Sequence, residues 1–571
     1  MYWKLRNVRR RKFREQFGEN PQKSLQADWV RNRLDKIKIY HEELLEEESQ
    51  INTNQSVESV IHEMPGDEKK VNILDDITWN DLDMDEVFVR INHTKSFLGE
   101  QVLYRRLHLL DSFWEDEKTE EQVEKESRTI KQQMLEDKIC YLSEAEEVRL
   151  DIEERLWRIG KSEGHYHLPT FFMHANDWQV QNGMMLRALQ VLLMFFFAGS
   201  ILSEHPFFVI GLAMVILINL MVYLYTKQQY EVFLYSLGSL KEIFCFCDWM
   251  LSDKERYRRF GNEQVEKAGR ELKRLSRKII KWQGRKSAGI AGDLASLMQD
   301  YLMGITLIDV ATFNQIVRVI GNRQEQVRAL YEFAGEIDML IAIASFRKSL
   351  DCWCVPRLIS GVNEKQGIIG GAIAHPLLEH PIANDFCLQN RAIITGANAS
   401  GKSTFMKALA VNVILAQTIG TCVAKEFQTP KINVMTSMAL RDDILTGESY
   451  YVKEIKYLKR MLDAMKKVPV LCVIDEILKG TNTSERLAAS EAILKYMAEE
   501  DGFVLIATHD KELVEKLQGI YETYYFESRI EEKDIKFDYR IREGKGGASN
   551  AIALLSLFEF PEKVLEHIKA G

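Results

Sequence analysis

The sequence is poor in cysteine and has no excess of positive charge. Its eight cysteines in 571 residues form no C-x-x-C pair, which argues against a zinc module or a disulfide framework and favours reduced thiols in a cytoplasmic compartment. His165 and His167 have no acidic or cysteine partner at ligand spacing, so they indicate no metal site. Because the net charge is −9, binding to nucleic acid would need a local basic surface.

Proline is also scarce, with ten residues in the chain and none between Trp79 and Tyr166. Long charged segments at 115–158 and 228–285 have the spacing of amphipathic helices, so a largely helical first half is expected. At roughly 150 residues per domain, the length suggests three or four units. The polar segment between Ser49 and Asp76 predicts a linker, and it follows a predicted helical segment at 1–48.

Two local stretches are basic. The first fourteen residues hold seven Lys or Arg, and no apolar run of the kind found in a secretory signal follows them. Residues 253–286 hold thirteen Lys or Arg against five Asp or Glu. Each stretch could lie on anionic lipid, on a phosphodiester backbone, or in solvent as an exposed helix face, and the sequence does not choose among the three.

Two long apolar runs, at 191–202 and 207–225, contain no charged residue. A four-residue turn containing Glu204 and Pro206 separates them, and each is apolar on all sides. About 20 apolar residues span a bilayer, which predicts a transmembrane hairpin at 184–226. Arg187 and Lys227 flank it, so both ends of the chain are placed in the cytoplasm, as in a multi-pass cell-membrane protein. The alternative is a hairpin buried in a protein core.

Residues 396–404, Gly-Ala-Asn-Ala-Ser-Gly-Lys-Ser-Thr, fit the phosphate-loop pattern G-x-x-x-x-G-K-[ST]. They follow an apolar run at 392–395 and precede a helical pattern from Phe405 to Leu415, the context that this loop requires. Backbone N–H groups of such a loop surround phosphate oxygens. Lys402 is expected on the β- and γ-phosphates and Ser403 on Mg²⁺, which predicts binding of a nucleoside triphosphate.

After Arg357, short β-rich runs alternate with helical patterns, as in a parallel α/β sheet. The buried run 468–476 ends in Asp475, placed to hold Mg²⁺, and Glu476, placed to orient or deprotonate water. The next run, 503–509, ends in His509, within reach of a γ-phosphate. A phosphate loop followed by these strand ends resembles the ABC-type ATPases.

Within that group, the chain resembles the MutS family of DNA mismatch-repair ATPases. Asn398 fits the family's G-x-N-x-x-G-K-S-T loop, Gln417 its Q-loop, and 475–483 its Walker B and Gly-Thr turn. Upstream, 375–376 and 381–385 resemble the family's entry strand, with Ile382 near the adenine. The resemblance implies ATP and Mg²⁺ as cofactors, with Glu476, His509 and Asn398 in catalysis. The ATP contacts that it implies are Gly396, Ala397, Asn398, Ala399, Ser400, Gly401, Lys402, Ser403, Thr404, Ile382, Gln417 and Asp475, with Ser403 and Asp475 on the metal.

The resemblance extends beyond this site. Residues 79–99 and 335–344 resemble the two ends of the family's helical lever domain, and 539–561 its carboxyl-terminal dimerisation region. A helical lever domain at 78–355 and an ATPase domain at 356–571 are therefore expected. A homodimer is implied, in which Ser449 caps a helix facing the γ-phosphate of the partner subunit.

The chain departs from the family in two places. Residues 445–454 keep Ser449 and Glu454 but lose the Thr-Phe-Met part of the family's signature. The residues before Trp79 are too few for a mismatch-recognition domain, although Phe13 and Phe17 each begin a Phe-x-Glu triplet. The expected function is a membrane-tethered, MutS-like, DNA-linked ATPase. The alternatives are an ATP-driven membrane scaffold without a DNA role and, less favoured, an ABC transporter subunit.

Overall fold

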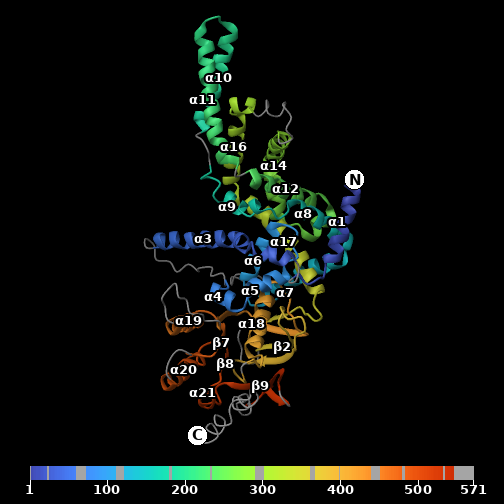
Figure 1. Cartoon of the computed structure of the whole chain (residues 1–571), viewed down its shortest axis with the longest axis vertical. Helices are drawn as coiled ribbons and strands as arrows, with labels where there is room; N and C mark the ends of the chain where they lie inside the picture. The colour runs from blue at the N-terminus through green and yellow to red at the C-terminus, as the bar shows by residue number, and fades with distance from the viewer. Residues whose placement is uncertain are drawn as a thin grey trace.

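The computed structural model shows an elongated molecule in which three parts follow one another along the long axis (Figure 1). An apolar helical hairpin projects from one end, a helical domain forms the middle, and an α/β domain forms the other end. The structure describes residues 2–21, 25–59, 73–110, 121–178, 183–231, 234–289, 301–359, 367–397, 399–438, 450–478, 483–531 and 534–545.

The helical domain is built around α17 (Gln324–Lys348), which packs against α6 (Phe97–His108), α7 (Glu121–Glu144), α12 (Leu234–Ser252) and α14 (Glu263–Gly289). Most side chains of α17 are buried, so neighbours surround it on nearly every face. The remaining helices of this part are α4 (Asp76–Asp81), α5 (Met84–Ile91), α8 (Glu146–Ile159), α9 (Leu168–Met173), α13 (Lys254–Phe260) and α16 (Ile308–Gly321), with a 3₁₀ turn, η2, at Glu163–His165.

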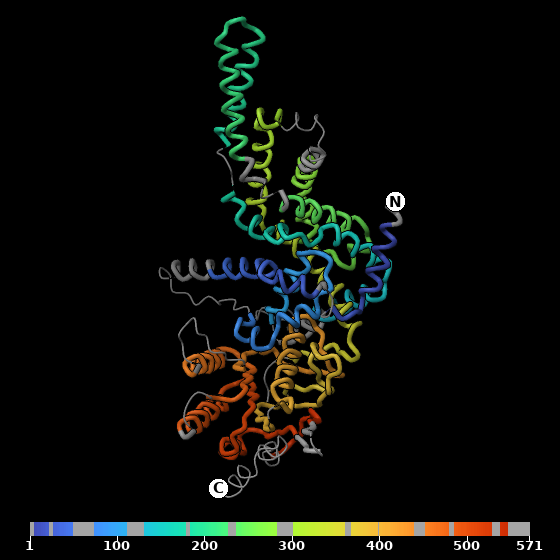
Figure 2. Tube along the Cα trace, in the orientation of Figure 1, coloured from blue at the N-terminus to red at the C-terminus, as the bar shows by residue number. Residues whose placement is uncertain are grey.

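The amino-terminal segment lies on this domain and is not separate from it (Figure 2). Its helices are α1 (Tyr2–Gln16), α2 (Leu25–Arg31) and α3 (Leu34–Ser59). α3 packs against α6, and the hydroxyl of Tyr40 donates to Glu332 at 2.5 Å. α3 is helical as far as Ser59, ten residues past the predicted start of the linker at Ser49.

The basic cluster at the start of the chain binds α8. Arg6 pairs with Glu154 at 2.8 Å, and Arg10 and Arg14 pair with Glu147 at 2.8 and 2.7 Å. Phe13 and Phe17 are buried, at 3% and 6% exposure, and the guanidinium of Arg149 on α8 lies 3.6 Å from the centre of the Phe17 ring. The arginines are therefore occupied by carboxylates within the chain, and the phenylalanines of the Phe-x-Glu triplets are parts of a helix interface.

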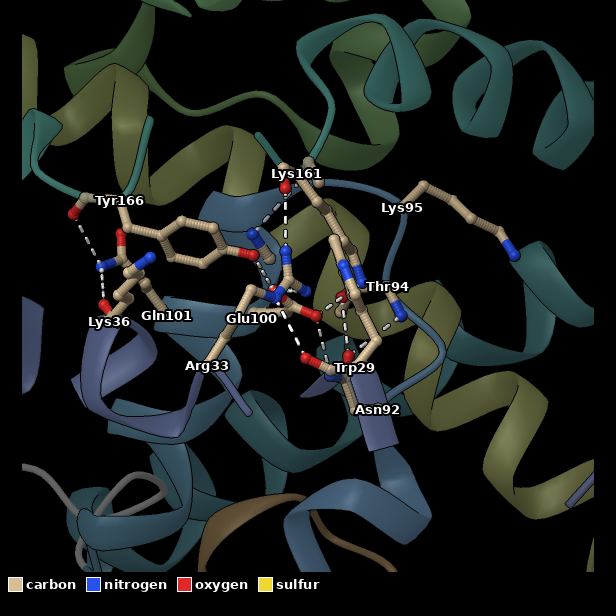
Figure 3. Close-up of polar contacts among 12 residues, drawn as sticks. Trp29, Arg33, Lys36, Asn92, Thr94, Lys95, Glu100, Gln101, Lys161 and Tyr166 are labelled. Carbon is tan, nitrogen blue, oxygen red and sulfur yellow. Dashed lines mark hydrogen bonds and ion pairs between the residues drawn. The ribbon is translucent and has the colours of Figure 1, made fainter. Parts of the chain in front are cut away.

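A buried polar network joins this segment to the helical domain (Figure 3). Glu100 on α6 is fully buried and accepts from Asn92 at 3.0 Å, Lys161 at 2.7 Å and the hydroxyl of Tyr166. Arg33 from the turn between α2 and α3 lies 3.7 Å from the same carboxylate and donates to the carbonyl of Lys161. A buried carboxylate needs such partners, because an unpaired charge in a protein interior is strongly destabilising.

The hairpin consists of α10 (Gly183–Leu202) and α11 (Pro206–Glu231). Both helices are long and apolar enough to cross a membrane, and only 6% and 17% of their most apolar windows are buried. A core hairpin would be covered by other parts of the chain, so the alternative of a buried hairpin is not what the structure shows. Gly199 and Gly211 leave room for the rings of Phe208 and Phe196, and a Cβ atom at either glycine would overlap the facing ring.

The α/β domain contains two sheets. The six-stranded sheet has the order β10-β9-β4-β8-β7-β6 and is parallel except for the β9–β10 pair, in agreement with the expected parallel sheet. The four-stranded sheet, β1-β5-β2-β3, is mixed, and the sequence did not predict it. The strands are β1 (Arg357–Ile359), β2 (Ile368–Ile373), β3 (Asn384–Leu388), β4 (Arg391–Thr395), β5 (Glu426–Pro430), β6 (Asn433–Ser437), β7 (Val470–Asp475), β8 (Gly502–Ala507), β9 (Glu522–Glu531) and β10 (Asp534–Glu543).

Four helices pack beside these sheets, namely α18 (Lys402–Thr418), α19 (Tyr450–Met465), α20 (Thr483–Met497) and α21 (Lys511–Lys516). Most side chains of α18 are buried, because the helix packs against both the sheets and the helical domain. It follows β4 directly through the loop 396–401, so the strand–loop–helix order expected from the sequence is present.

Candidate functional site

A cavity of about 680 Å³ opens at the carboxyl ends of the central parallel strands. The loop between β4 and α18 forms its floor, the residues after β7 and β8 form one wall, and residues 373–384 with Tyr539 form the other. Ligands of open α/β sheets bind at this edge, because loops and helix amino termini meet there. The cavity thus brings together most of the residues that the sequence singled out.

The loop conformation depends on its glycines. Gly396 and Gly401 have φ angles of +146° and +100°, which favour glycine. A Cβ atom on Gly396 would lie 2.9 Å from the carbonyl oxygen of Phe526, and one on Gly401 would lie 3.0 Å from the ring of Tyr539. Ala399 also has a positive φ, +66°. The loop is therefore held tightly against β9 and β10, and it ends at the first turn of α18.

Lys402 is 5% exposed and lies under this loop. Its Nζ donates to the carbonyls of Gly396 at 2.7 Å and Ala397 at 2.9 Å, and it lies 3.4 Å from Nε2 of His509. Next to it, the hydroxyl of Ser403 donates to Oδ2 of Asp475 at 2.6 Å. An ammonium group and a pair of hard oxygen ligands therefore face the same cavity. Oxygen ligands of this kind suit Mg²⁺, which keeps several waters when it binds to proteins.

The parallel register of β7 and β8 explains why Glu476 and His509 meet. Asp475 pairs with Ala507, so the residues that follow the two strands emerge at the same edge. Oε1 of Glu476 lies 3.1 Å from Nε2 of His509. Glu476 has a φ of +62°, and its N–H donates to the carbonyl of Ala507 at 3.0 Å. This strained position turns the carboxylate into the cavity, beside the Ser403–Asp475 pair.

The opposite wall is less polar. Ile382 lines it and is 44% exposed. Asn384 fixes the neighbouring β10, since its side chain donates to the carbonyl of Tyr539 at 3.0 Å and accepts from the N–H of Ile541 at 2.9 Å. His375 is buried there, and burial, with Lys407 nearby, lowers its pKa to about 4, which keeps the ring neutral. An apolar wall beside a cationic loop suits a ligand with a flat ring and a charged tail.

Four predicted site residues are not among the residues that line the cavity, and one of these is Gly396, the first residue of the glycine loop. Gln417 is fully buried near the end of α18, where its amide donates to the carbonyl of Ile432 at 2.9 Å and accepts from its N–H at 3.0 Å. The structure does not bring it to the cavity, because both ends of the amide are bound in the core. Asn398 and Ser449 lie outside the described residues.

The sequence missed other residues that line the cavity. Leu378, His380, Phe405 and Phe526 lie in its wall, and Tyr539 was noted only for its place in the carboxyl-terminal region. No local sequence pattern predicts that these side chains line the cavity. Pairing of β9 with β4 and the packing of residues 378–382 bring them to the loop. A φ of +53° at Tyr539, next to the bulge in β10, could not be read from the sequence.

This geometry agrees with the comparison to known families. Residues 392–570 match MutS domain V. The matched region begins in β4 and includes the glycine loop and the ends of β7 and β8, whereas the lining residues between 373 and 384 precede it.

Curated relatives extend the match. The chain is 29% identical over 277 residues to DNA mismatch repair protein MutS 2 of Haloarcula marismortui, and 32% identical over 255 residues to MutS protein homolog 4 of Homo sapiens. These alignments cover 43% and 41% of this chain and 28% and 26% of the relatives. MutS of Aquifex pyrophilus is 26% identical over 331 residues, 56% of this chain and 34% of that protein. The chain is thus similar to MutS proteins over part of its length, and it spans about a quarter to a third of these relatives' length.

Proposed function

We propose that the protein is a MutS-type ATPase that binds Mg²⁺–ATP in the cavity between the glycine loop and the ends of β7 and β8. The observation that supports this most is the convergence of Lys402, the Ser403–Asp475 pair and the Glu476–His509 pair on one cavity within the match to MutS domain V. Charge-assisted contacts from Lys402 and loop N–H groups would hold the β- and γ-phosphates. Ser403 and Asp475 would hold the cation, and the apolar wall at Ile382 would face the base.

Hydrolysis needs a water in line with the γ-phosphorus. Glu476 is positioned to accept a hydrogen bond or proton from that water, and His509 lies between Glu476 and Lys402, where it can reach a γ-phosphate oxygen. Phosphoryl transfer depends mainly on positioning and on stabilising charge, which matches a site made of one cation, two carboxylates and an imidazole.

Two substitutions test this function. Glu476→Gln removes the base and keeps the metal ligand, so nucleotide binding should persist while single-turnover hydrolysis falls by about 100-fold or more. Lys402→Ala should weaken binding itself. Glu499→Gln, an exposed change in the same domain, is the control. Hydrolysis at a near wild-type rate in Glu476→Gln would refute the assignment.

We also propose that α10 and α11 tether the protein to the cytoplasmic face of a membrane. Exposed large apolar side chains cover both helices, including Val191, Phe195, Ile201, Ile210 and Leu217. An apolar surface of this extent is costly in water, and a bilayer would cover it. Arg187 and Lys227 at the base favour cytoplasmic ends.

Cysteine labelling tests the tether and its orientation. With the exposed Cys140, Cys245 and Cys352 changed to Ser, a cysteine at Ser203 in the hairpin turn should react with an impermeant reagent from outside the cell. A cysteine at Ser143, exposed on α7, should not. Extraction of the protein by alkaline washing, with neither site reached from outside, would show that the hairpin is not embedded.

A composite dimer site is part of the proposal, based on the MutS resemblance. If Ser449 acts on the partner subunit's nucleotide, Ser449→Ala dimers should hydrolyse ATP slowly. Mixing them with Lys402→Ala subunits should restore about one site per heterodimer. Mixed dimers without recovered activity would argue against action across the dimer.

DNA binding is proposed from the relatives' names as DNA mismatch repair proteins. The competing function is an ATP-driven membrane scaffold, which the apolar hairpin favours. Salt-dependent binding to duplex and mismatched DNA separates the two, because phosphate contacts release counterions and their number sets the slope. A scaffold would show no DNA-dependent change in ATP hydrolysis.

A further inference from the structure

α14 carries an unpartnered cationic face. Its apolar side chains, among them Leu272, Ile279 and Trp282, are buried against the helical domain. The opposite face is exposed and presents a row of basic residues at helical spacing, which are Lys267, Arg270, Arg274, Arg277 and Lys281, with Lys273 beside it. Over these fourteen steps the row is about 21 Å long. We call it the α14 stripe.

Within the described part of the chain, most of the stripe has no ion-pair partner. Arg270 lies 3.7 Å from Glu266, one turn earlier. For Lys267, Arg274, Arg277 and Lys281, the described part of the chain provides no ion-pair partner. The nearby Glu271 is turned toward Arg323 on the other side, at 2.7 Å. Four like charges along one helix face repel one another, and an anionic partner would relieve this repulsion.

The stripe approaches the base of the hairpin. Lys278 bonds Gln315 of α16, and the rings of Trp282 and Phe313 lie 6.3 Å apart, so the carboxyl-terminal half of α14 packs on α16. The turn before α16 is fastened to both hairpin helices. Gln190 of α10 donates to the carbonyl of Thr306 at 3.0 Å, and Asn219 of α11 donates to that of Ile305 at 2.7 Å. α14 and α16 accordingly rise beside the hairpin in Figure 1.

Exposed apolar side chains lie on α14 and on and just before α16. Tyr301 and Leu302, before α16, are 58% and 60% exposed, and Ile308 at its start is 41% exposed. Ile280, within the stripe's helix, is 38% exposed. A nucleic-acid backbone offers no partner for exposed aliphatic side chains, whereas a lipid surface takes cations at its headgroups and apolar groups just below them.

We propose that the α14 stripe binds the anionic headgroups of the membrane that holds the hairpin. This inference rests on the proposed tether. Each Lys or Arg near an anionic leaflet adds to the attraction, which decays within a Debye length of about 10 Å at 0.1 M salt. The stripe therefore sets the lipid composition around the protein and holds the helical domain against the membrane surface.

Lipid retention tests the stripe on the full chain. Protein reconstituted in vesicles of equal phosphatidylglycerol and phosphatidylcholine is extracted in mild detergent, and the phospholipids that remain bound are quantified. Wild-type protein should retain phosphatidylglycerol over phosphatidylcholine by at least about three-fold at 0.1 M salt, and the preference should vanish at 1 M salt.

Two matched sets of substitutions test whether the α14 stripe causes the preference for phosphatidylglycerol. Changing Lys267, Arg274, Arg277 and Lys281 to Gln should abolish it. Changing four exposed lysines of the α/β domain to Gln, namely Lys456, Lys466, Lys467 and Lys511, should leave it intact. Unchanged ATP hydrolysis in detergent checks that the stripe variant folds. No preference in wild type, or an equal preference in the stripe variant, overturns the inference.

A DNA-binding measurement tests the alternative that the partner of the stripe is a nucleic acid. If the stripe variant loses salt-dependent binding to a 30-base-pair duplex and keeps its lipid preference, the stripe is a nucleic-acid surface and the inference is wrong. The tether is measured separately, because alkaline washing reports on the hairpin whatever the lipid charge. Loss of the tether and loss of the stripe therefore give different results.

Discussion

The ammonium group of Lys407 lies 2.6 Å from the carboxylate of Asp83, and this pair joins α18, the helix after the glycine loop, to the helical domain. Asp83 follows α4, which docks on β6. There, Oδ2 of the buried Asp81 accepts from the hydroxyl of Thr436 at 2.7 Å and the N–H of Met438 at 2.9 Å. The turn around α4 thus contacts both the first helix after the loop and an edge strand of the six-stranded sheet. A shift of the loop upon nucleotide binding would reach the helical domain through these contacts.

The first prediction concerns this connection. Asp81→Ala leaves the Thr436 hydroxyl and the Met438 N–H without their buried acceptor, so the free energy of unfolding should fall by about 1–3 kcal/mol. Lys407→Ala breaks an ion pair in which Asp83 is 57% exposed, and its cost should stay below about 1 kcal/mol. Denaturant unfolding of the two variants measures the difference. Equal losses would show that the buried contact does not dominate the docking.

The second prediction concerns the close approach of α6 and α17. Asp338 of α17 accepts from the N–H groups of Lys95 at 2.9 Å and Ser96 at 2.8 Å, and a Cβ atom on Gly99 would overlap its carboxylate. Gly99→Ala should therefore destabilise the protein by about 1–3 kcal/mol through overpacking.

Gly269 provides the control for Gly99, because it also lies inside a helix. A Cβ atom there would meet only Leu251, at 3.4 Å. Gly269→Ala should be neutral or stabilising by up to about 1 kcal/mol, since alanine favours the helix. Thermal unfolding of both variants decides the matter, and a Gly99→Ala protein as stable as the wild type would contradict the packing argument.

Local patterns were enough to locate the central part of the site. The glycine loop, Asp475, Glu476 and His509 were predicted from strand and loop signatures, and parallel strands in register bring such residues to one edge. The length and apolarity of the hairpin were also visible, because helix length and composition are local properties. The register between β7 and β8 was not predicted, yet it places Glu476 beside His509.

Tertiary contacts decide features that local patterns do not show. Gln417 sits at the position of a Q-loop glutamine, but the core carbonyl and N–H of Ile432 bind its amide. For the basic start of the chain the sequence left open lipid, a phosphodiester backbone and solvent, and its arginines are paired with α8, a contact across more than 130 residues. The helix α3 extends to Ser59, past the predicted start of the linker at Ser49, and its polar sequence did not indicate this length.

The third prediction concerns acid stability. His93 is buried in the helical domain, and burial, followed by the charges of Lys95, Arg90 and Lys161, lowers its pKa to about 3. In the unfolded chain, where the pKa of this histidine is near 6.5, the ring binds a proton that it does not bind in the folded protein. The contribution of His93 to the free energy of unfolding is therefore fully present above pH 6.5 and is lost as pH falls toward 3.

His93→Gln should flatten the dependence of the unfolding free energy on pH, by on the order of 1.5 kcal/mol between pH 6.5 and 5. His167→Gln, at an exposed site, is the control. An unaltered slope in His93→Gln would show that this ring is not the titrating group.

The last prediction concerns Glu454, which we infer to be a positioning residue for the proposed hydrolysis. Glu454 lies on α19 at 1% exposure, and its Oε1 accepts from the N–H of Leu478 at 2.5 Å. Leu478 and Glu476 have φ angles of +57° and +62°, a region that costs energy for residues other than glycine. The contact from Glu454 therefore helps to hold the strained turn that presents Glu476 to the cavity.

Glu454→Ala should lower single-turnover ATP hydrolysis by about 10–100-fold, because a small displacement of the catalytic carboxylate is costly in phosphoryl transfer. Nucleotide affinity should change little, since Lys402 and the glycine loop remain in place. Glu454→Gln keeps an oxygen acceptor for the N–H of Leu478 and should recover most of the rate. Glu454→Met has a similar volume but no such acceptor, so it should remain slow. If Glu454 only filled volume, the two variants would have equal rates. Asp463→Ala, on the exposed face of the same helix, is the control. A parallel loss of affinity and rate in Glu454→Ala, or equal rates in the Gln and Met variants, would show that Glu454 supports the fold of this domain and does not position Glu476.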